Sequence, residues 1–252
     1  MDTDTGWARR AVPGFRPSVH GFRFANAFPP GPTLVIGPLD VRRLGVGDSS
    51  AGLCGGMALT VRDLFEAGVP VPQDPAPPAN GSRRFHALVR RQVESLDWLR
   101  VPLRFWQLQA LHPDGPGGLM ASVTRAVGLR PAAEVALDRE WPAIRAVLDT
   151  GRLAVVGLVR ATGLSPWRLA VSHQVLAWAY EPTPTGLRVW IYDPNHPGRD
   201  DVTVEFVRTA TGTAMHQETG EPLRAILALP YRRGSVGPWR MVRPGPVGPP
   251  PV

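Results

Sequence analysis

The chain has 252 residues, of which 43% are hydrophobic, so it can bury the core of one large domain or two small ones. Its net charge is +7 and every one of its 28 basic residues is arginine, which excludes a lysine nucleophile or Schiff base. A single cysteine, Cys54, excludes internal disulfides and four-cysteine zinc sites. The arginines are scattered without interleaved aromatic residues, so we expect no nucleic-acid partner.

The N-terminal ten residues carry no apolar stretch of the signal-peptide type. No segment approaches the roughly 20 apolar residues that a membrane span requires. We therefore expect no membrane span and a cytoplasmic location, with leaderless secretion left open. The sequence does not indicate an oligomeric state.

Residues 1–20 are rich in Gly, Pro and Arg and predict a loose N-terminal arm. The stretch from Gly21 to Phe28 alternates apolar and polar residues, which predicts a short strand or an extended arm packed on the body. It opens a domain that we place at residues 21–235. Residues 236–252 predict a Pro-rich disordered tail.

A helix is expected to begin at about Cys54, and Gly68 and Pro70 are expected to terminate it. The Pro-rich stretch from Val69 to Ser82 predicts an exposed loop. Three further helices are expected at 82–99, 117–127 and 138–150, the last with Asp138 as its N-cap and Gly151 at its end. The apolar face of the first helix consists of Met57, Val61, Leu64, Phe65 and Gly68.

After Gly151 the apolar pattern changes from helical spacing to strand-like runs separated by turn residues. Helices followed by an antiparallel sheet are typical of the α+β class. The predicted strands are Leu153–Val159, Val171–Tyr180, Leu187–Tyr192, Val202–Val207 and Ala225–Leu229.

Cys54 stands at the predicted start of its helix, between Gly52 and the pair Gly55–Gly56. A thiol reacts as its thiolate, and the free N–H groups and dipole of a helix N-terminus lower its pKa. The flanking glycines allow a substrate to approach the backbone closely. A lone cysteine is also commonly a small buried apolar residue. We interpret Cys54 as a nucleophile.

His173 is the best-placed base, because it lies near the start of a strong predicted strand. A histidine there can also be a purely structural residue whose ring is hydrogen bonded at the edge of the sheet. A turn centred between Thr183 and Pro184 pairs His173 with position 194, beside Asp193. A carboxylate on one ring nitrogen fixes the tautomer and stabilises the imidazolium. Asn195 is a rival for the orienting role.

The segment from Asp193 to Asp201 is rich in oxygen ligands, but Pro197 stands where a calcium loop needs its fifth residue. We expect neither a metal nor another cofactor. No serine lies in a G-x-S-x-G turn, which disfavours serine hydrolase chemistry. The other histidines have no identifiable partner; they are His20, His86, His112, His196 and His216.

Three motifs, GDSSAGLCGGMALTVRDLF, SHQVLAWAY and WIYDPNHPG, together resemble the papain-like cysteine peptidase superfamily, in particular bacterial branches similar to bacteriocin-processing peptidase domains. The resemblance covers roughly residues 20–230. It implies a Cys-bearing helix packed on a C-terminal antiparallel sheet, with a triad of Cys54, His173 and Asp193.

One departure from that superfamily concerns the oxyanion. Its members usually carry a glutamine a few residues before the cysteine, and here Gly47 to Ala51 contains none. The oxyanion donors would come from backbone groups of Gly52 to Gly55 or from Ser49 or Ser50. Losing one donor typically costs about 10²–10³ in rate. Gln174 is expected to point to the opposite face of its strand.

We therefore predict a cysteine hydrolase that acts on a peptide or amide bond of a peptide or protein substrate. A protein-modifying acyltransferase, such as a transglutaminase, or a deamidase with the same triad is one alternative. A catalytically silent papain-like binding module is the other, and the missing glutamine favours it.

Overall fold

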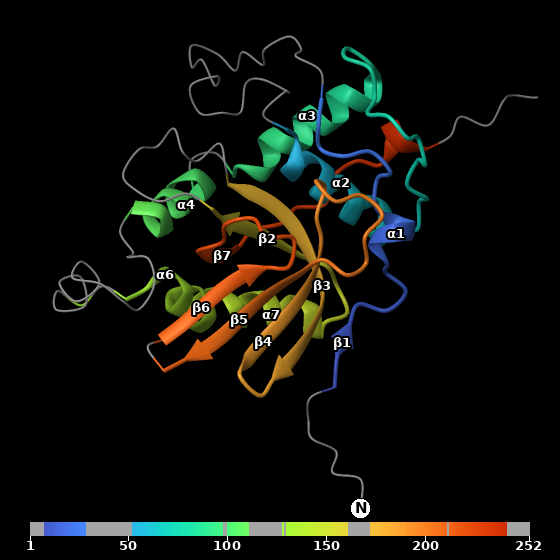
Figure 1. Ribbon diagram of the computed structural model, residues 1–252. Coiled ribbons are helices and arrows are strands. Elements are labelled where there is room, and N and C mark those ends of the chain that lie inside the picture. The colour runs from blue at the N-terminus through green and yellow to red at the C-terminus, as the bar shows by residue number, and fades with distance from the viewer. Residues whose placement is uncertain are drawn as a thin grey trace, which may run out of the picture.

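A computed structural model describes residues 8–28, 52–97, 100–110, 128, 130–160, 172–210 and 212–240. Its long helices precede an antiparallel sheet along the chain, so the protein has the predicted α+β arrangement with a C-terminal sheet (Figure 1). The helices are α1 (Pro17–His20), α2 (Cys54–Glu66), α3 (Arg83–Ser95), α4 (Arg100–Ala110), α6 (Ala132–Val135), the π-helix η3 (Ala136–Glu140), α7 (Trp141–Asp149) and the 3₁₀-helix η5 (Gly237–Trp239).

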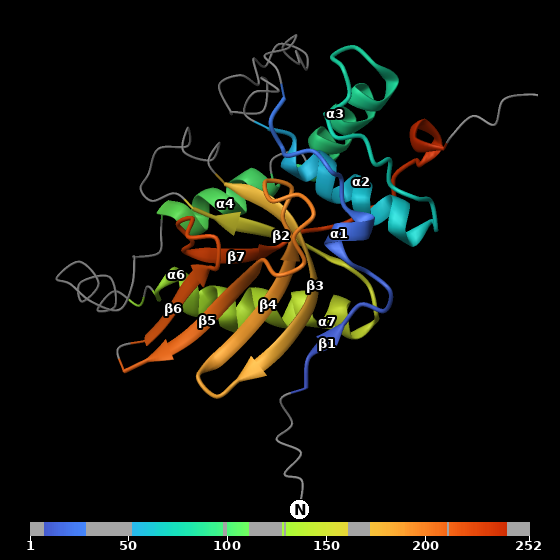
Figure 2. The ribbon, with the colours of Figure 1, turned by 45° about the vertical axis from the view of Figure 1, so that its right-hand side comes forward.

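All strand pairs in the described part of the chain are antiparallel, in the order β6-β5-β4-β3-β2-β7. The short strand β1 also pairs with β3, beyond the end of β2. Figure 2 shows β3 at the centre of this arrangement. The strands are β1 (Arg10–Ala11), β2 (Ala154–Val159), β3 (His173–Thr183), β4 (Gly186–Tyr192), β5 (Thr203–Thr209), β6 (Gly212–Gln217) and β7 (Ala225–Ala228).

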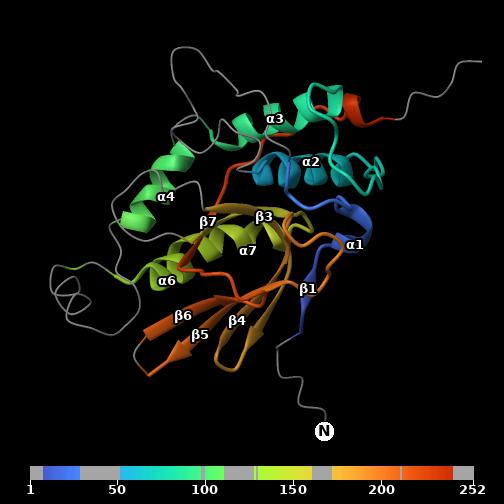
Figure 3. The same ribbon diagram turned by 45° about the horizontal axis from the view of Figure 1, so that its top comes forward.

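Helices cover both sides of β2, β3 and β7. Helices α2, α3 and α4 lie on one side and α7 on the other (Figures 1 and 3). Helix α2 packs on β3, and α7 packs on β2, β3 and β7. The strands between these two layers are therefore almost fully buried, and β2 is buried along its whole length.

Helix α2 begins at Cys54 as predicted and is more deeply buried than an amphipathic surface helix. Met57, Val61 and Leu64 of its predicted apolar face are fully buried, and so are the polar Thr60 and Asp63. The reason is α3, which crosses α2 so closely that a Cβ at position 56 would lie 2.3 Å from the carbonyl oxygen of Leu88. The sheet and α3 thus enclose α2 between them.

Two predicted helix boundaries need correction. Helix α3 begins at Arg83, one residue after the predicted start, with Ser82 as its N-cap, but it already ends at Ser95. The helical stretch before β2 begins at Ala132, and Asp138 lies inside its π-helical segment, where it binds Arg130 and caps nothing. Helix α4 was not predicted, and the helix expected at 117–127 lies outside the described residues.

The β3–β4 hairpin differs in register from the prediction. Its turn lies at residues 184–185, so that Thr183 pairs with Gly186. A bulge at Trp178 then shifts the pairing by one residue, and Leu176 pairs with Tyr192. The bulge removes part of the register error, so His173 and Asp193 still lie at the same end of adjacent strands.

Residues 8–28 pack on the body and do not form a loose arm. Residues 8–20 contain β1 and α1, and Val12 and Phe15 are buried. The stretch from Gly21 to Phe28 forms no strand and packs on the body as an extended arm. At the other end, η5 buries Trp239, within the region predicted to be a tail, and residues 241–252 lie outside the described part.

Candidate active site

Cys54 is the first residue of α2 and its side chain is half-buried. The turn before it needs a glycine, because Gly52 has a φ of +89° and a Cβ there would lie 2.4 Å from the side-chain nitrogen of Asn26. Leu53 is the N-cap residue and has no side chain that can accept a hydrogen bond. The N–H groups of the first helical turn therefore depend on partners from elsewhere in the chain.

Those partners are identifiable for most of the first turn. Asn26 Oδ1 accepts from the N–H of Leu53 at 2.6 Å, and the buried Gln92 Oε1 accepts from the N–H of Gly56 at 2.9 Å. The N–H groups of Gly55 and Gln174 donate to the sulfur of Cys54. Within the part of the chain that the structure describes, the N–H of Cys54 itself has no acceptor.

His173 is the first residue of β3 and is 4% exposed. Its Nε2 lies 2.6 Å from Oδ1 of Asp193, and its ring also hydrogen bonds to Cys54. Because Nε2 faces the carboxylate, Nδ1 is the ring nitrogen left for the thiol, the reverse of the serine-protease template. The structure thus brings Cys54, His173 and Asp193 into one hydrogen-bonded series.

Asp193 follows the end of β4 and is 1% exposed. The backbone N–H of Asn195 donates to its Oδ1 at 2.8 Å, and Gln217 Nε2 donates to its Oδ2 at 3.0 Å. The guanidinium of Arg160 lies 3.8 Å from the same Oδ2. These donors fix the carboxylate in a buried position, where an unpaired charge would be costly.

Asn195 was the rival orienter, and the hydrogen bonds of its side chain among the described residues go to Asn26 and not to the imidazole. It contributes its backbone N–H to Asp193, and its Oδ1 accepts from Asn26 Nδ2 at 3.2 Å. Among the described residues, Asp193 is therefore the side chain that holds the His173 ring. His196 forms a turn with Asp193 and places its Nε2 2.8 Å from Glu221.

The electrostatics of the series favour a charged pair. Burial alone would raise the pKa of Cys54, but the charge and hydrogen bond of His173 and the two backbone N–H groups outweigh it and lower the pKa below its usual value. Burial would lower the pKa of His173, but Asp193 and Cys54 raise it to about 10. Burial also opposes ionisation of Asp193, yet His173 and the N–H of Asn195 lower its pKa to about 2. Both shifts favour the thiolate–imidazolium form of the pair over the neutral form.

Of the residues considered for the oxyanion region, the structure describes Gln174 but not the two serines. Ser49 and Ser50 lie outside the described residues, so their role stays a prediction. Gln174 was expected to point away, but a Cβ at Gly55 would lie 2.6 Å from its Oε1. The buried amide of Gln174 thus lies against the first turn of α2, and within the described residues its Oε1 has no hydrogen-bond partner.

Four polar residues around the triad were not predicted: Asn26, Gln92, Arg160 and Gln217. Gln92 and Gln217 lie on α3 and β6, far from the triad in sequence. Asn26 did leave a signal, because it occupies an inward position of an alternating series whose other members are the buried Phe22, Phe24 and Phe28. A polar residue in such a series indicates a specific partner.

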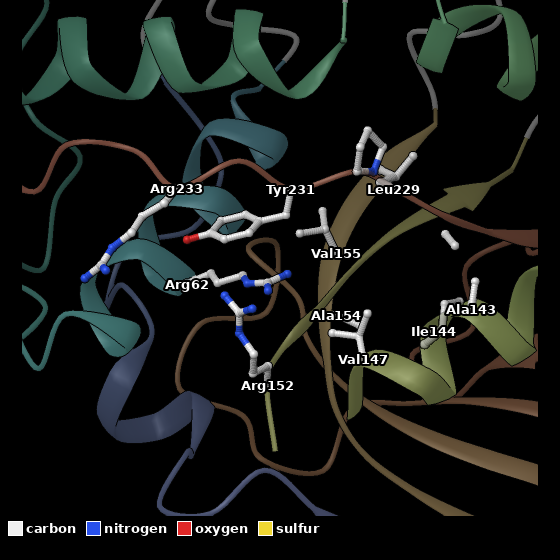
Figure 4. Close-up of a pocket in the computed structure, with 12 residues that line it drawn as sticks. Arg62, Ala143, Ile144, Val147, Arg152, Ala154, Val155, Leu229, Tyr231 and Arg233 are labelled. Atoms are coloured by element: carbon white, nitrogen blue, oxygen red, sulfur yellow. The ribbon is translucent and has the colours of Figure 1, made fainter. Parts of the chain in front are cut away.

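A separate pocket of about 390 Å³ lies near the C-terminal end of α2, at the opposite end of that helix from Cys54 (Figure 4). Its walls are mainly apolar residues of α7, β2 and the segment after β7, with Arg62, Arg152 and Arg233 beside the ring of Tyr231. Arg62 and Arg152 both bind the carboxylate of Glu66, which compensates one of their two positive charges. This pocket contains no member of the triad.

The residues that the structure describes contain no group of three or more His, Cys, Asp or Glu side chains arranged to hold a metal ion. None of their helices combines the length and the apolar composition needed to cross a bilayer.

Comparisons with known proteins found no family model, no curated protein and no solved structure that matches this chain.

Proposed function

We propose that this protein is a papain-like cysteine hydrolase that cleaves a peptide or amide bond. The observation that carries the proposal is the hydrogen-bonded series from the chain's single thiol, at the N-terminus of a buried helix, through His173 to the buried Asp193. The order Cys, His, Asp along the chain, on a first long helix and two consecutive strands, is the order of the superfamily that the sequence resembles.

In the first half of the reaction, the Cys54 thiolate attacks the carbonyl carbon and forms a C–S bond, while the carbonyl electron pair moves onto oxygen. The imidazolium of His173 then gives its proton to the leaving nitrogen as the C–N bond breaks. A thioester and a free amine result. In the second half, neutral His173 takes a proton from water, and the hydroxide releases the acid and restores the thiolate.

Asp193 has an orienting role in this scheme. Its Oδ1 accepts from Nε2 of His173, so that Nδ1 faces the sulfur through both half-reactions. The carboxylate also stabilises the imidazolium, which is consistent with the raised pKa of His173. Asp193 itself stays ionised throughout, because its pKa is lowered to about 2.

The N–H of Cys54 is the best oxyanion donor in the described part of the site. The neighbouring N–H groups of Leu53 and Gly56 are already bonded to side-chain amides, and that of Gly55 faces the sulfur. Preorganised donors of this kind stabilise the negative oxygen of the tetrahedral intermediate.

Acylation by p-nitrophenyl acetate tests the proposal without knowledge of the natural substrate. The wild-type protein should release nitrophenolate and gain the mass of one acetyl group on Cys54. Cys54→Ser and His173→Ala should each reduce the acylation rate by at least about 10³-fold, in line with the loss of a triad member. Circular dichroism would check that both variants remain folded. If folded Cys54→Ser were acylated as fast as the wild-type protein, the assignment of Cys54 as the nucleophile would be contradicted.

The products on a protein substrate separate hydrolysis from the alternatives. Mass spectrometry of candidate proteins treated with wild-type and Cys54→Ser protein should show chain cleavage that depends on Cys54. Deamidated glutamine or new cross-links would indicate a deamidase or a transglutaminase instead. A Cys54 that is not acylated and reacts with thiol reagents like free cysteine would indicate a binding module.

A further inference from the structure

Asn26 belongs to the extended arm that precedes α2 and occupies a polar position in an apolar series. Phe22, Phe24 and Phe28 point into the core and anchor the arm on both sides of it. Phe24 packs on both Phe22 and Phe28. The arm is therefore held in place by aromatic contacts, and the half-buried Asn26 has a defined position between them.

Three hydrogen bonds connect Asn26 to the two halves of the candidate site. Its Oδ1 accepts from the N–H of Leu53 at 2.6 Å, and its own N–H donates to the carbonyl of Pro194 at 2.9 Å. Its Nδ2 donates to Oδ1 of Asn195 at 3.2 Å. Asn26 thus joins the residue before the nucleophile to the two residues after Asp193.

These bonds complete a closed ring. From Asn195 the ring continues through its N–H to Asp193, and from Asp193 to His173. His173 hydrogen bonds to Cys54, and Cys54 is covalently next to Leu53. Without Asn26, the helix that carries the nucleophile and the loop that carries the carboxylate would be connected in this ring only through the imidazole.

Asn26 also binds the backbone at the start of α2. Leu53 is the N-cap residue and cannot accept a hydrogen bond through its side chain. The amide oxygen of Asn26 accepts the N–H of Leu53 from a distant part of the chain, and Gly52 leaves the space that this amide needs. The first N–H groups of a helix have no partner within the helix, so the loss of this acceptor would leave one of them unsatisfied.

We propose that Asn26 is a positioning residue that holds the Cys54 turn in register with His173 and Asp193. This inference depends on the proposed function of the triad. Asn26 fixes the start of α2 relative to the Pro194–Asn195 loop, and the thiolate therefore stays within hydrogen-bonding reach of the imidazolium.

The test is the pH profile of Cys54 alkylation by iodoacetamide, which needs the thiolate and no oxyanion donor. Asn26→Ala should alkylate about tenfold more slowly at pH 7 and shift the profile to higher pH, because the lost hydrogen bonds to Leu53 and Asn195 no longer hold the thiolate beside the imidazolium. Arg23→Ala, on the same arm at an exposed position, should leave the profile unchanged.

A second variant tests the same bridge from its other end, in case Asn26→Ala does not fold. Asn195→Ala removes the bridge to Asn26 Nδ2 from the other side, keeps the backbone N–H that binds Asp193, and should shift the profile in the same direction. If neither variant shifts the profile while His173→Ala does, Asn26 is no positioning residue and the triad still stands. If His173→Ala also leaves the profile unchanged, the proposed function itself fails.

Discussion

Asp193 is the residue on which the charges of the candidate site depend. Its carboxylate is almost fully buried, accepts from His173, Asn195 and Gln217, and lies near the guanidinium of Arg160. The pKa values of the pair move apart: that of His173 rises from 6.5 to about 10 and that of Asp193 falls from 3.8 to about 2. Each shift couples folding stability to pH.

The His173–Asp193 pair should stabilise the fold within a defined pH window. The raised pKa of His173 adds stability that is complete below pH 6.5 and lost as pH rises toward about 10. The lowered pKa of Asp193 adds stability that is complete above pH 3.8 and lost as pH falls toward about 2. Both contributions are therefore complete between these ordinary values, at about pH 4–6.5.

Urea unfolding at several pH values measures this window. Both proteins in the comparison carry Cys54→Ser, so that ionisation of the thiol does not contribute, and the reference also carries His173→Gln and Asp193→Asn, so that neither position titrates. The difference in unfolding free energy between Cys54→Ser and this reference should be largest near pH 5 and decline toward pH 9. A difference that stays constant from pH 5 to pH 9 would contradict the ion pair.

At the level of single residues, the sequence indicated the three members of the triad but not the polar side chains that bind them. Cys54, His173 and Asp193 stand at ends of a helix and two strands, and such ends are visible in local apolar patterns and glycines. Gln217 could not be found in this way, because β6 has the sequence GTAMHQ, which lacks a clear alternation of apolar and polar residues. Its place beside Asp193 follows from the pairing of β6 with β5.

Helix α2 is the element that positions the nucleophile, and its contact with α3 depends on Gly56. Helix propensity alone predicts that Gly56→Ala stabilises the protein by about 1 kcal/mol. The added Cβ, however, would lie 2.3 Å from the backbone oxygen of Leu88, which cannot move away as a side chain can. We expect overpacking to dominate and Gly56→Ala to cost about 2–3 kcal/mol.

Chemical denaturation of Gly56→Ala against wild type decides between these effects. Gly68→Ala is the control at the other end of the same helix, where a Cβ meets no atom within 4 Å and only the left-handed φ of +63° is penalised. That control should lose about 1 kcal/mol. A Gly56→Ala protein more stable than wild type would show that α2 and α3 separate without cost.

The element boundaries illustrate where local patterns stop being sufficient. The start of α2 and the strands β2, β3, β4, β5 and β7 were predicted to within a few residues from apolar spacing. The β3–β4 register was not, because the bulge at Trp178 and the position of the turn are set by packing around the hairpin. Asp138 resembled an N-cap because a capping side chain and a mid-helix side chain paired with Arg130 look alike in sequence.

On the scale of the whole molecule, the chain after β7 runs along the helical layer, where it contacts α2 and α3. There, Tyr231 and Gly234 both donate to Asp63 of α2, and Arg91 of α3 binds the same carboxylate. Asp63 therefore connects two helices and the C-terminal segment. The sequence pattern could not indicate this, because a single aspartate in an amphipathic helix normally predicts a solvated position.

Asp63→Asn should destabilise the whole fold by about 3–5 kcal/mol, because it leaves the buried charge of Arg91 without its main partner. The side chains of Arg91 and Asp63 are only 6% and 3% exposed, so water cannot replace the lost interaction. Glu94→Gln is the matched control, since Glu94 pairs with the same arginine but is 46% exposed. Such a surface pair contributes about 0–1 kcal/mol.

Thermal and urea unfolding of the two variants, followed by circular dichroism, measures the contrast. A large loss in Asp63→Asn with little change in Glu94→Gln would establish Asp63 as the connection between the helical layer and the C-terminal segment. Equal, small losses in both would mean that Arg91 finds another partner or remains solvated. In that case the aromatic and apolar contacts of Tyr231 and Trp239 would hold the C-terminal segment by themselves.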